Sequence, residues 1–69
     1  MPDKKIVGDR LRTIRTKLGL SQEEFAKKLG IAQSAVAMYE IGERTPRDEI
    51  KKKIAVIAKS KIDSIFFED

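Results

Sequence analysis

The 69-residue sequence contains no cysteine and no histidine. Without cysteine there is no disulfide framework, no thiolate nucleophile and no sulfur-ligated metal site. Without histidine the most common general base and metal ligand is missing as well. The carboxylates show no spacing typical of an acid/base pair or a metal site. We therefore expect no catalytic residues, no metal and no cofactor, and we do not expect an enzyme.

Long hydrophobic segments are also missing. The longest apolar run, residues 54–58, is far shorter than the roughly 20 residues of a transmembrane helix. Residues 1–5 contain no signal-peptide core. We expect a cytoplasmic protein with no membrane partner. Because 69 residues support one small core, we expect a single domain over residues 1–69, too small to enclose a cleft for a small-molecule ligand.

Charge, by contrast, is abundant and unevenly distributed. The chain has 15 Lys and Arg against 11 Asp and Glu, a net charge of +4. Every basic residue lies at or before Lys61, so residues 1–62 carry a net charge of +7. A basic domain favours a polyanionic partner such as nucleic acid, although the same charge would also serve solubility.

The apolar residues recur with the period of an α-helix, and no useful stretch alternates with the period of a strand. Gly19, Gly30 and Gly42 each follow such a helical stretch and can end it in the left-handed conformation. The sequence therefore predicts an all-α fold of five short helices. We expect them from Lys4 to about Leu18, from Ser21 to Gly30, from Gln33 to about Ile41, from Thr45 onward, and from Ser60 onward.

Each expected helix has an apolar face that would turn toward the core. In chain order these faces are formed by Val7, Leu11, Ile14 and Leu18; by Phe25, Ala26 and Leu29; by Val36 and Tyr39; by Ile50, Ile54 and Ile57; and by Ile62, Ile65 and Phe66.

Three of the expected helices begin with a capping pattern. Ser21 and Glu24 have the spacing of a capping box, in which each side chain binds a free backbone N–H of the other residue. Thr45 followed by Pro46 is typical of an N-cap and a first helical position. Ser60 begins a similar pattern before the last helix.

Only residues 30–32 separate the second helix from the third, which predicts a helix-turn-helix over about residues 22–41. Two short helices alone would be weak evidence, but they lie within a longer ordered pattern. The pattern consists of Leu20-Ser21-Gln22-Glu23-Glu24-Phe25-Ala26, Leu29-Gly30, Gln33-Ser34, Val36, Tyr39-Glu40, Gly42, Arg44 and Pro46. It closely resembles the DNA-binding domain family of phage λ repressor and Cro, the XRE-type transcriptional regulators, over roughly residues 6–67.

The resemblance implies a compact five-helix fold whose third helix enters the major groove of double-stranded DNA. Gln33 begins that helix, and its carboxamide can pair with the N6 and N7 edge of adenine. Ser34 can donate to a purine, Ala37 permits close approach, and Met38 offers an apolar surface to a thymine methyl group. The alternatives are a merely solvated helix start for Gln33 and Ser34, and for Met38 a surface that faces a partner protein or nothing.

Phosphate contacts are expected from Ser21 and Gln22, because a helix N-terminus favours an anion. The resemblance also implies that Gln22 braces Gln33. Arg44 and Arg47 are the other backbone candidates, although Arg47 could equally be a solvated residue of a first helical turn. The lysines of residues 51–53 more often solvate the outer face of a helix than bind nucleic acid.

The same family pairs a first-helix arginine with the glutamate that follows the aromatic residue of the third helix, which here are Arg15 and Glu40. We interpret that ion pair as architectural. The sequence departs from the family in two places. Ala32 stands where relatives usually have Ser or Thr, and it forfeits a helix cap worth about 1 kcal/mol. Ala58 and Ser60 stand where many relatives have a large apolar residue. This predicts that the junction between the fourth and fifth helices is thinly packed or is completed by a second subunit.

We therefore expect a sequence-specific regulator of phage, plasmid or bacterial origin, most simply a homodimeric repressor of a palindromic operator. Ile65, Phe66 and Phe67 are the candidates for its dimer surface, with the alternative that Ile65 and Phe66 belong to the core. A different hypothesis is a protein-interaction module, such as an antitoxin or adaptor, which would use the acidic, aromatic end at residues 66–69.

Overall fold

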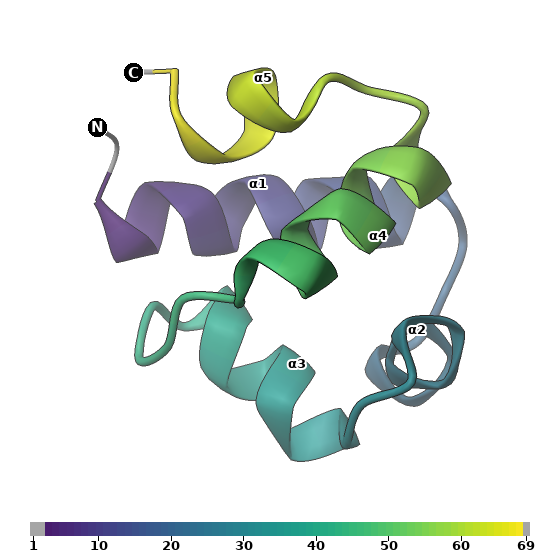
Figure 1. Cartoon of the computed structure of the whole chain (residues 1–69). Coiled ribbons are helices and arrows are strands. Elements are labelled where there is room, and N and C mark those ends of the chain that lie inside the picture. Colours follow the sequence, from purple (N-terminus) through teal and green to yellow (C-terminus); the bar gives the residue numbers. More distant parts are fainter. Residues whose placement is uncertain (1–2, 69) are drawn as a thin grey trace.

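A computed structural model describes residues 3–68; Met1, Pro2 and Asp69 of the expected 1–69 domain lie outside the described residues. Five helices follow one another along the chain, and the described residues contain no strand (Figure 1). The prediction of an all-α, five-helix fold is confirmed. The helices are α1 (Lys4–Lys17), α2 (Gln22–Leu29), α3 (Gln33–Glu40), α4 (Asp48–Ala58) and α5 (Ile62–Phe66).

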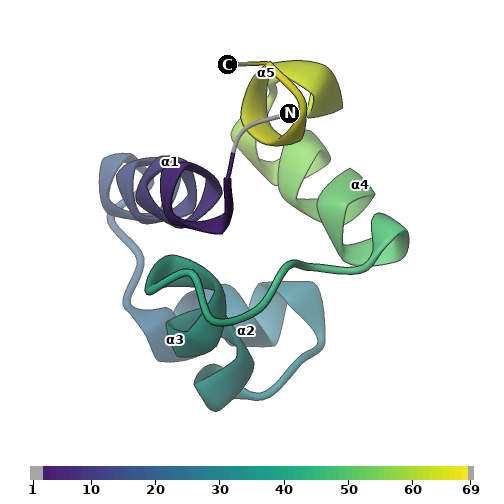
Figure 2. The same ribbon diagram turned by 90° about the vertical axis from the view of Figure 1, so that its left-hand side faces the viewer.

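The helices enclose one core. The α1 helix packs on α3 and α5, α3 packs on α2, and α4 packs on α2 and α5. As Figure 2 shows, α2 and α3 form one side of the molecule, and α5 lies at the opposite side, near the start of α1. The most deeply buried large side chains come from four helices, and they are Leu11, Phe25, Leu29, Val36 and Ile54. Burial of the expected apolar faces therefore holds the helices together.

The first helix runs over the expected residues, but one residue of its predicted apolar face is exposed. It ends at Lys17, and Leu18, which we expected on the apolar face, is an exposed C-cap residue. Gly8 lies inside the helix and is buried against the end of α3. A Cβ atom at Gly8 would lie 2.5 Å from the backbone oxygen of Glu40 and 2.6 Å from that of Tyr39. Only glycine allows α1 to approach the backbone of α3 this closely.

The start of α4 was predicted wrongly. The helix begins at Asp48, and its N-cap is Arg47 rather than Thr45. Pro46 is not the first helical residue but a buried residue of the preceding loop. Burial of the Pro46 ring therefore takes precedence over the local capping signal. Asp48 and Glu49 supply the acidic first turn that favours the positive end of the helix.

The start of α5 was also predicted wrongly. Lys61 is its N-cap, and no side chain caps the helix. The backbone N–H of Ser60 instead donates to the carbonyl of Ala55 and so closes the end of α4. Lys59, with φ 53°, supplies the left-handed residue of that turn. Ser60 therefore completes one helix instead of beginning the next.

The lysines of α4 do not all solvate its outer face as we expected. The Lys51 ammonium lies 4.8 Å from the centre of the Phe67 ring and 5.6 Å from that of Phe66, and its side chain is only 12% exposed. The Lys53 ammonium donates to the carbonyl of Leu29 at 3.4 Å. Lys52 and Lys53 are exposed, as expected. The stem of Lys51 instead covers a neighbouring element because α4 lies against α5.

The expected dimer surface requires a second correction at α5. Ile65 and Phe66 are buried in the core, whereas Phe67 is 40% exposed. The alternative that these two residues are core is therefore the correct one. A hollow of about 430 Å³ opens between α1 and α5, and Ser60 is among its lining residues. The thin packing predicted at the junction of α4 and α5, to which Ser60 belongs, stays a prediction. No helix within residues 3–68 has the length and apolar character of a membrane span.

Candidate nucleic-acid interface

The turn between α2 and α3 sets the direction of α3. Gly30 adopts the left-handed conformation (φ 71°, ψ 33°), and its N–H donates to the carbonyls of Ala26 and Lys27. Ile31 donates to the same Ala26 carbonyl at 3.0 Å. Ala32 then serves as an extended N-cap without a side-chain hydrogen bond, and α3 begins at Gln33 as predicted. The tight turn therefore holds the start of α3 at a fixed angle to α2.

The four base-contact candidates lie on the outer part of α3. Val36 and Tyr39 on the opposite side are buried, so this helix has one fixed inner face. The candidates comprise the exposed residues Gln33, Ser34 and Met38 and the half-buried Ala37. Within residues 3–68 the side chains of Gln33 and Ser34 make no hydrogen bond, which leaves their polar atoms available to a ligand.

The candidates for phosphate binding come from two segments. Ser21 forms the predicted capping box: its hydroxyl oxygen accepts from the Glu24 N–H at 3.1 Å, and its own N–H donates to the Glu24 carboxylate at 2.9 Å. The hydrogen bond from the Ser21 backbone N–H to the carboxylate is the largest cause of the lowered pKa of Glu24, and the interaction of the carboxylate with the Ser21 hydroxyl lowers it further. Arg44 and Arg47 are exposed in the segment after α3. The backbone N–H of Arg44 donates to the carbonyl of Met38 at 3.3 Å, which holds this loop beside the end of α3.

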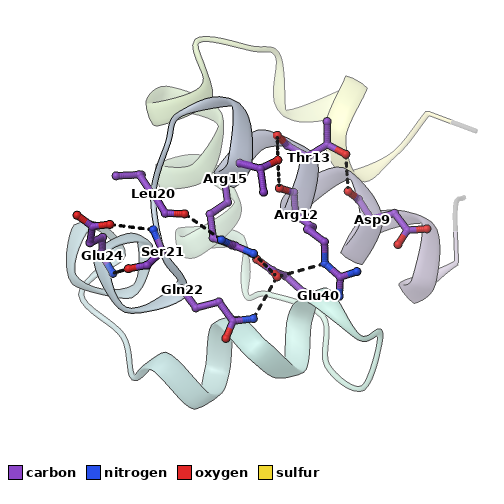
Figure 3. A network of polar contacts seen from close by, with 10 residues as sticks. Asp9, Arg12, Thr13, Arg15, Leu20, Ser21, Gln22, Glu24 and Glu40 are labelled. Atoms are coloured by element: carbon purple, nitrogen blue, oxygen red, sulfur yellow. Dashed lines mark hydrogen bonds and ion pairs between the residues drawn. The ribbon is translucent and has the colours of Figure 1, made fainter.

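Behind these surfaces, the Glu40 carboxylate is the centre of a buried polar network (Figure 3). Arg15 donates through Nε to Oε2 at 2.7 Å and through Nη2 to Oε1 at 3.2 Å, so the expected ion pair is present. The remaining Nη1 donates to the carbonyl of Leu20 at 2.9 Å. Glu40 is 3% exposed, so its carboxylate has little contact with water. The hydrogen bonds from its partners compensate for that lost hydration.

The environment of Glu40 acts on its pKa in both directions. Burial alone raises the pKa, because it disfavours the charged carboxylate. Hydrogen bonds from Arg15 and Gln22, together with the charges of Arg15 and Arg12, outweigh burial and hold the pKa below its usual value. The hydrogen bond between Arg15 and Glu40 also raises the pKa of Arg15. Both groups therefore remain charged in the folded protein at neutral pH.

Two members of this network were not predicted. The Gln22 amide donates to Glu40 Oε1 at 3.2 Å, so in this structure Gln22 braces the buried carboxylate instead of Gln33. Arg12 lies with its Nε 3.6 Å from the same oxygen, and its side chain is half exposed. The spacing of Arg12 and Arg15, one helical turn apart, was the signal that could have revealed the second arginine. The nearby buried charge attracts the Gln22 amide more strongly than a neutral carboxamide would.

The described residues contain no group of three or more acidic side chains placed to hold a metal ion. What they do contain is a polar helix start, a basic loop and a capped helix N-terminus on the α2 and α3 side of the molecule. A sequence model of helix-turn-helix domains matches residues 11–63, which include all three features. The chain belongs to the helix-turn-helix family. It is an XRE-type, λ repressor-like transcriptional regulator.

Two relatives that are similar in sequence support the assignment of this regulator to the family. A relative from Archaeoglobus fulgidus, described as an uncharacterized HTH-type transcriptional regulator, is 35% identical over 60 residues, which cover 87% of this chain and 86% of the relative. A second relative from that organism, with the same description, is 33% identical over 87% of this chain and 84% of its own length.

Two solved structures share the fold of this helix-turn-helix regulator. The restriction-modification controller protein C.AhdI from Aeromonas hydrophila has a TM-score of 0.82 and 33% identity, over 91% of this chain and 96% of that protein. The P22 c2 repressor, crystallised in complex with a synthetic operator, has a TM-score of 0.86 and 25% identity, over 93% of this chain and 97% of that protein.

Proposed function

We propose that this regulator is a homodimeric repressor that binds a two-fold symmetric operator with one α3 helix of each subunit in the major groove. The observation that carries the proposal is the exposed start of α3, where Gln33 and Ser34 have free polar groups on a helix fixed by its buried inner face. The P22 c2 repressor, which shares the fold, was crystallised with operator DNA. Occupancy of the operator would then block access of RNA polymerase.

We assign base readout to Gln33, Ser34, Ala37 and Met38. Gln33 pairs with an adenine edge, Ser34 donates to a purine, and Met38 packs against a thymine methyl group that the small Ala37 allows to approach. The free side-chain amide of Gln33 and the exposure of Met38 support these roles. Residues at the N-terminal end of a recognition helix reach the base edges in this class of protein.

We assign backbone positioning to Ser21, Gln22, Arg44 and Arg47. Ser21 and Gln22 begin α2, whose N-terminal N–H groups favour a phosphate. The hydrogen bond between Arg44 and Met38 supports a contact by Arg44 to a phosphate next to the bases that α3 reads. The Gln22 amide has two N–H bonds, and the hydrogen bond to Glu40 uses one of them, so the other is available to donate to a phosphate.

Dimerisation would use the side of the molecule formed by α1 and α5. Phe67 at the end of α5 and Ile6 near the start of α1 are about two-fifths exposed. The hollow beside Ser60 lies between the same two helices and offers a place for a side chain of the second subunit. This side lies away from α3 (Figure 2), so contact there leaves both α3 helices free to bind half-sites about 34 Å apart.

The test is selection of bound duplexes from a randomised DNA pool at about 0.15 M salt, where non-specific attraction to phosphates is weakened. We expect an inverted repeat whose half-sites are one helical turn apart, bound by two chains per duplex in sedimentation equilibrium. Recovery of no motif, or of one half-site bound by one chain, would contradict the homodimeric repressor.

A double variant tests the assigned base contacts on the selected duplex. Gln33→Ala with Ser34→Ala removes two polar contacts, each worth about 1 to 3 kcal/mol, so affinity should fall roughly 30-fold or more. Glu49→Ala with Lys52→Ala is the matched control, because both residues are exposed on α4, outside the assigned DNA contacts and the α1 and α5 side, and the net charge is unchanged. Equal affinity of the first variant and the control would refute the assignment.

A further inference from the structure

A second surface, formed where the end of α4 lies beside α2, has an apolar floor. Val56 is 77% exposed there, the largest exposure of any large hydrophobic side chain in the described residues. Two adjoining hollows of about 380 and 530 Å³ share Val56 and Ile57. Leu18 and Leu20, from the segment between α1 and α2, extend the floor. A single exposed valine would be ordinary. Val56, however, lines two hollows together with other apolar side chains, which is typical of an interaction surface.

The rim of this surface carries charge of one sign. All charged residues that line the two hollows, among residues 3–68, are lysines: Lys28, Lys52, Lys53 and Lys59. The hydrogen bond from Lys53 to the carbonyl of Leu29 holds its stem across the gap between α4 and α2. The wall of the groove therefore exists before any partner binds. We call the surface formed by these eight lining residues the lysine groove.

The lysine groove is separate from the candidate DNA interface. It uses Lys28 in the last turn of α2, whereas the phosphate candidates Ser21 and Gln22 stand at the other end of that helix. No residue of α3 lines either hollow in the described part of the chain. A molecule bound in the groove would therefore leave the exposed start of α3 free.

We propose that the lysine groove binds an acidic amphipathic helix of a partner protein. Apolar side chains on one face of such a helix would pack on Val56 and Ile57, as in other complexes where a helix lies in a hydrophobic groove. Carboxylates beside that face would pair with the lysines of the rim, and this charge complementarity selects acidic partners and speeds their association. DNA would satisfy the lysines but not the apolar floor, so a protein helix fits both properties of the surface better.

The groove also gives the regulator a means of carrying a partner to DNA. Because the two surfaces do not overlap, binding of the acidic helix and binding of DNA are expected to be independent apart from the long-range effect of charge. The short acidic end of a second copy is a poorer occupant, because a contact between two different surfaces of identical chains propagates instead of closing into a dimer.

The probe for this proposal is a synthetic 15-residue peptide with leucines at i, i+3, i+4 and i+7 and with glutamate or alanine elsewhere. We titrate it into the full chain labelled with ¹⁵N and follow the backbone amide signals. We expect saturable shifts centred on Val56, Ile57 and Lys28, with the Gln33 amide unchanged. The same peptide with lysine in place of every glutamate should not bind.

Matched variants keep the test independent of folding. Val56→Ser and Lys28→Glu should each raise the dissociation constant about two- to fivefold, the size expected when one exposed contact or charge pair is lost. Lys27→Glu makes the same charge change in the same turn of α2 but lies outside the groove, and it should change the constant much less. Thermal melts of all three variants should match the parent, because these side chains are exposed.

Three results would overturn the proposal. In the first, binding of the acidic peptide does not saturate, or the backbone amide signals that shift belong to residues outside the groove. The Val56 amide shifts with protein concentration in the absence of peptide, which would identify a second copy as the occupant. A random-sequence DNA duplex shifts Val56 and Lys28 as strongly as Gln33, which would make the groove part of the DNA surface.

Discussion

Arg15 of α1 and Glu40 of α3 form a two-point ion pair in which Nε lies 2.7 Å from Oε2 and Nη2 lies 3.2 Å from Oε1. The third guanidinium nitrogen, Nη1, binds the carbonyl of Leu20, which immediately precedes the α2 cap. Gln22, the first residue of α2, donates to the same carboxylate. One buried charge thus connects α1, the end of α3 and the start of α2. The pair fixes the two helices of the helix-turn-helix relative to the rest of the fold.

Removal of the carboxylate should therefore be costly. In Glu40→Ala the Arg15 guanidinium and the Gln22 amide lose a buried partner, and we expect a loss of about 3 to 5 kcal/mol in the free energy of unfolding. Urea denaturation measures this loss. Glu43→Ala is the control, because Glu43 is exposed in the next loop, and its cost should stay within about 0.5 kcal/mol. Equal costs at the two positions would refute the structural role of Glu40.

Acid should weaken the same network. The folded-state pKa of Glu40 lies below its ordinary value of 4.5, so the ionised carboxylate stabilises the fold fully above that value. The contribution is lost as the pH falls through the lowered pKa of the folded state. We expect a melting temperature that is insensitive to Glu40 between pH 7 and about 5 and that declines below about 4.5. The Glu40→Gln variant should show a shallower decline, and parallel curves would argue against this linkage.

Gly8 should resist replacement despite its place inside a helix. Alanine normally stabilises a helix interior by about 1 kcal/mol relative to glycine. Here its Cβ would press on the backbone oxygens of Tyr39 and Glu40, which cannot move aside like a flexible side chain. We expect Gly8→Ala to destabilise the fold by about 1 to 3 kcal/mol in urea. Asp9→Ala, at the exposed next position, should be neutral or slightly stabilising, and a stabilised Gly8→Ala would show that α1 can move away from α3.

The missing cap of α3 should be restorable. Ala32 has the extended backbone of an N-cap but no oxygen to bind the free N–H groups of the helix. Ala32→Ser should raise the free energy of unfolding by about 1 kcal/mol. Ala32→Val adds a side chain without a hydrogen-bond acceptor and should give no such gain. If serine gains no more than valine, these N–H groups already have adequate partners in water.

The two loop arginines should affect DNA binding through charge alone. If Arg44 and Arg47 each contact a phosphate in both subunits of the dimer, replacing both with alanine should reduce the slope of log affinity against log salt by about 4, with the selected sequence unchanged. Fluorescence anisotropy over a range of salt concentrations measures the slope. Lys52→Ala, an exposed charge on α4 outside the assigned DNA contacts and the dimer surface, should leave the slope nearly unchanged. A change of about 2 in the double variant would leave Arg47 as a solvated residue.

The amino-acid sequence by itself determined the features that depend on short spacings along the chain. The apolar period of the helices, the left-handed glycines and the Ser21–Glu24 capping box are all present as predicted. The ordered pattern through α2 and α3 was also sufficient to indicate the family, because those residues form one local unit. Their roles toward DNA remain predictions, since they depend on a ligand.

Only the tertiary structure decided the features that depend on residues distant in sequence. Thr45 and Ser60 had capping signals, yet burial of Pro46 and the closing turn of α4 moved both helix starts. Gln22 turned to Glu40 because folding brings a buried charge within 3.2 Å of its amide. The lysine groove likewise exists only where α2 and α4 meet. Local preferences are each worth about 1 kcal/mol, and packing or a buried charge outweighs them when the chain closes around its core.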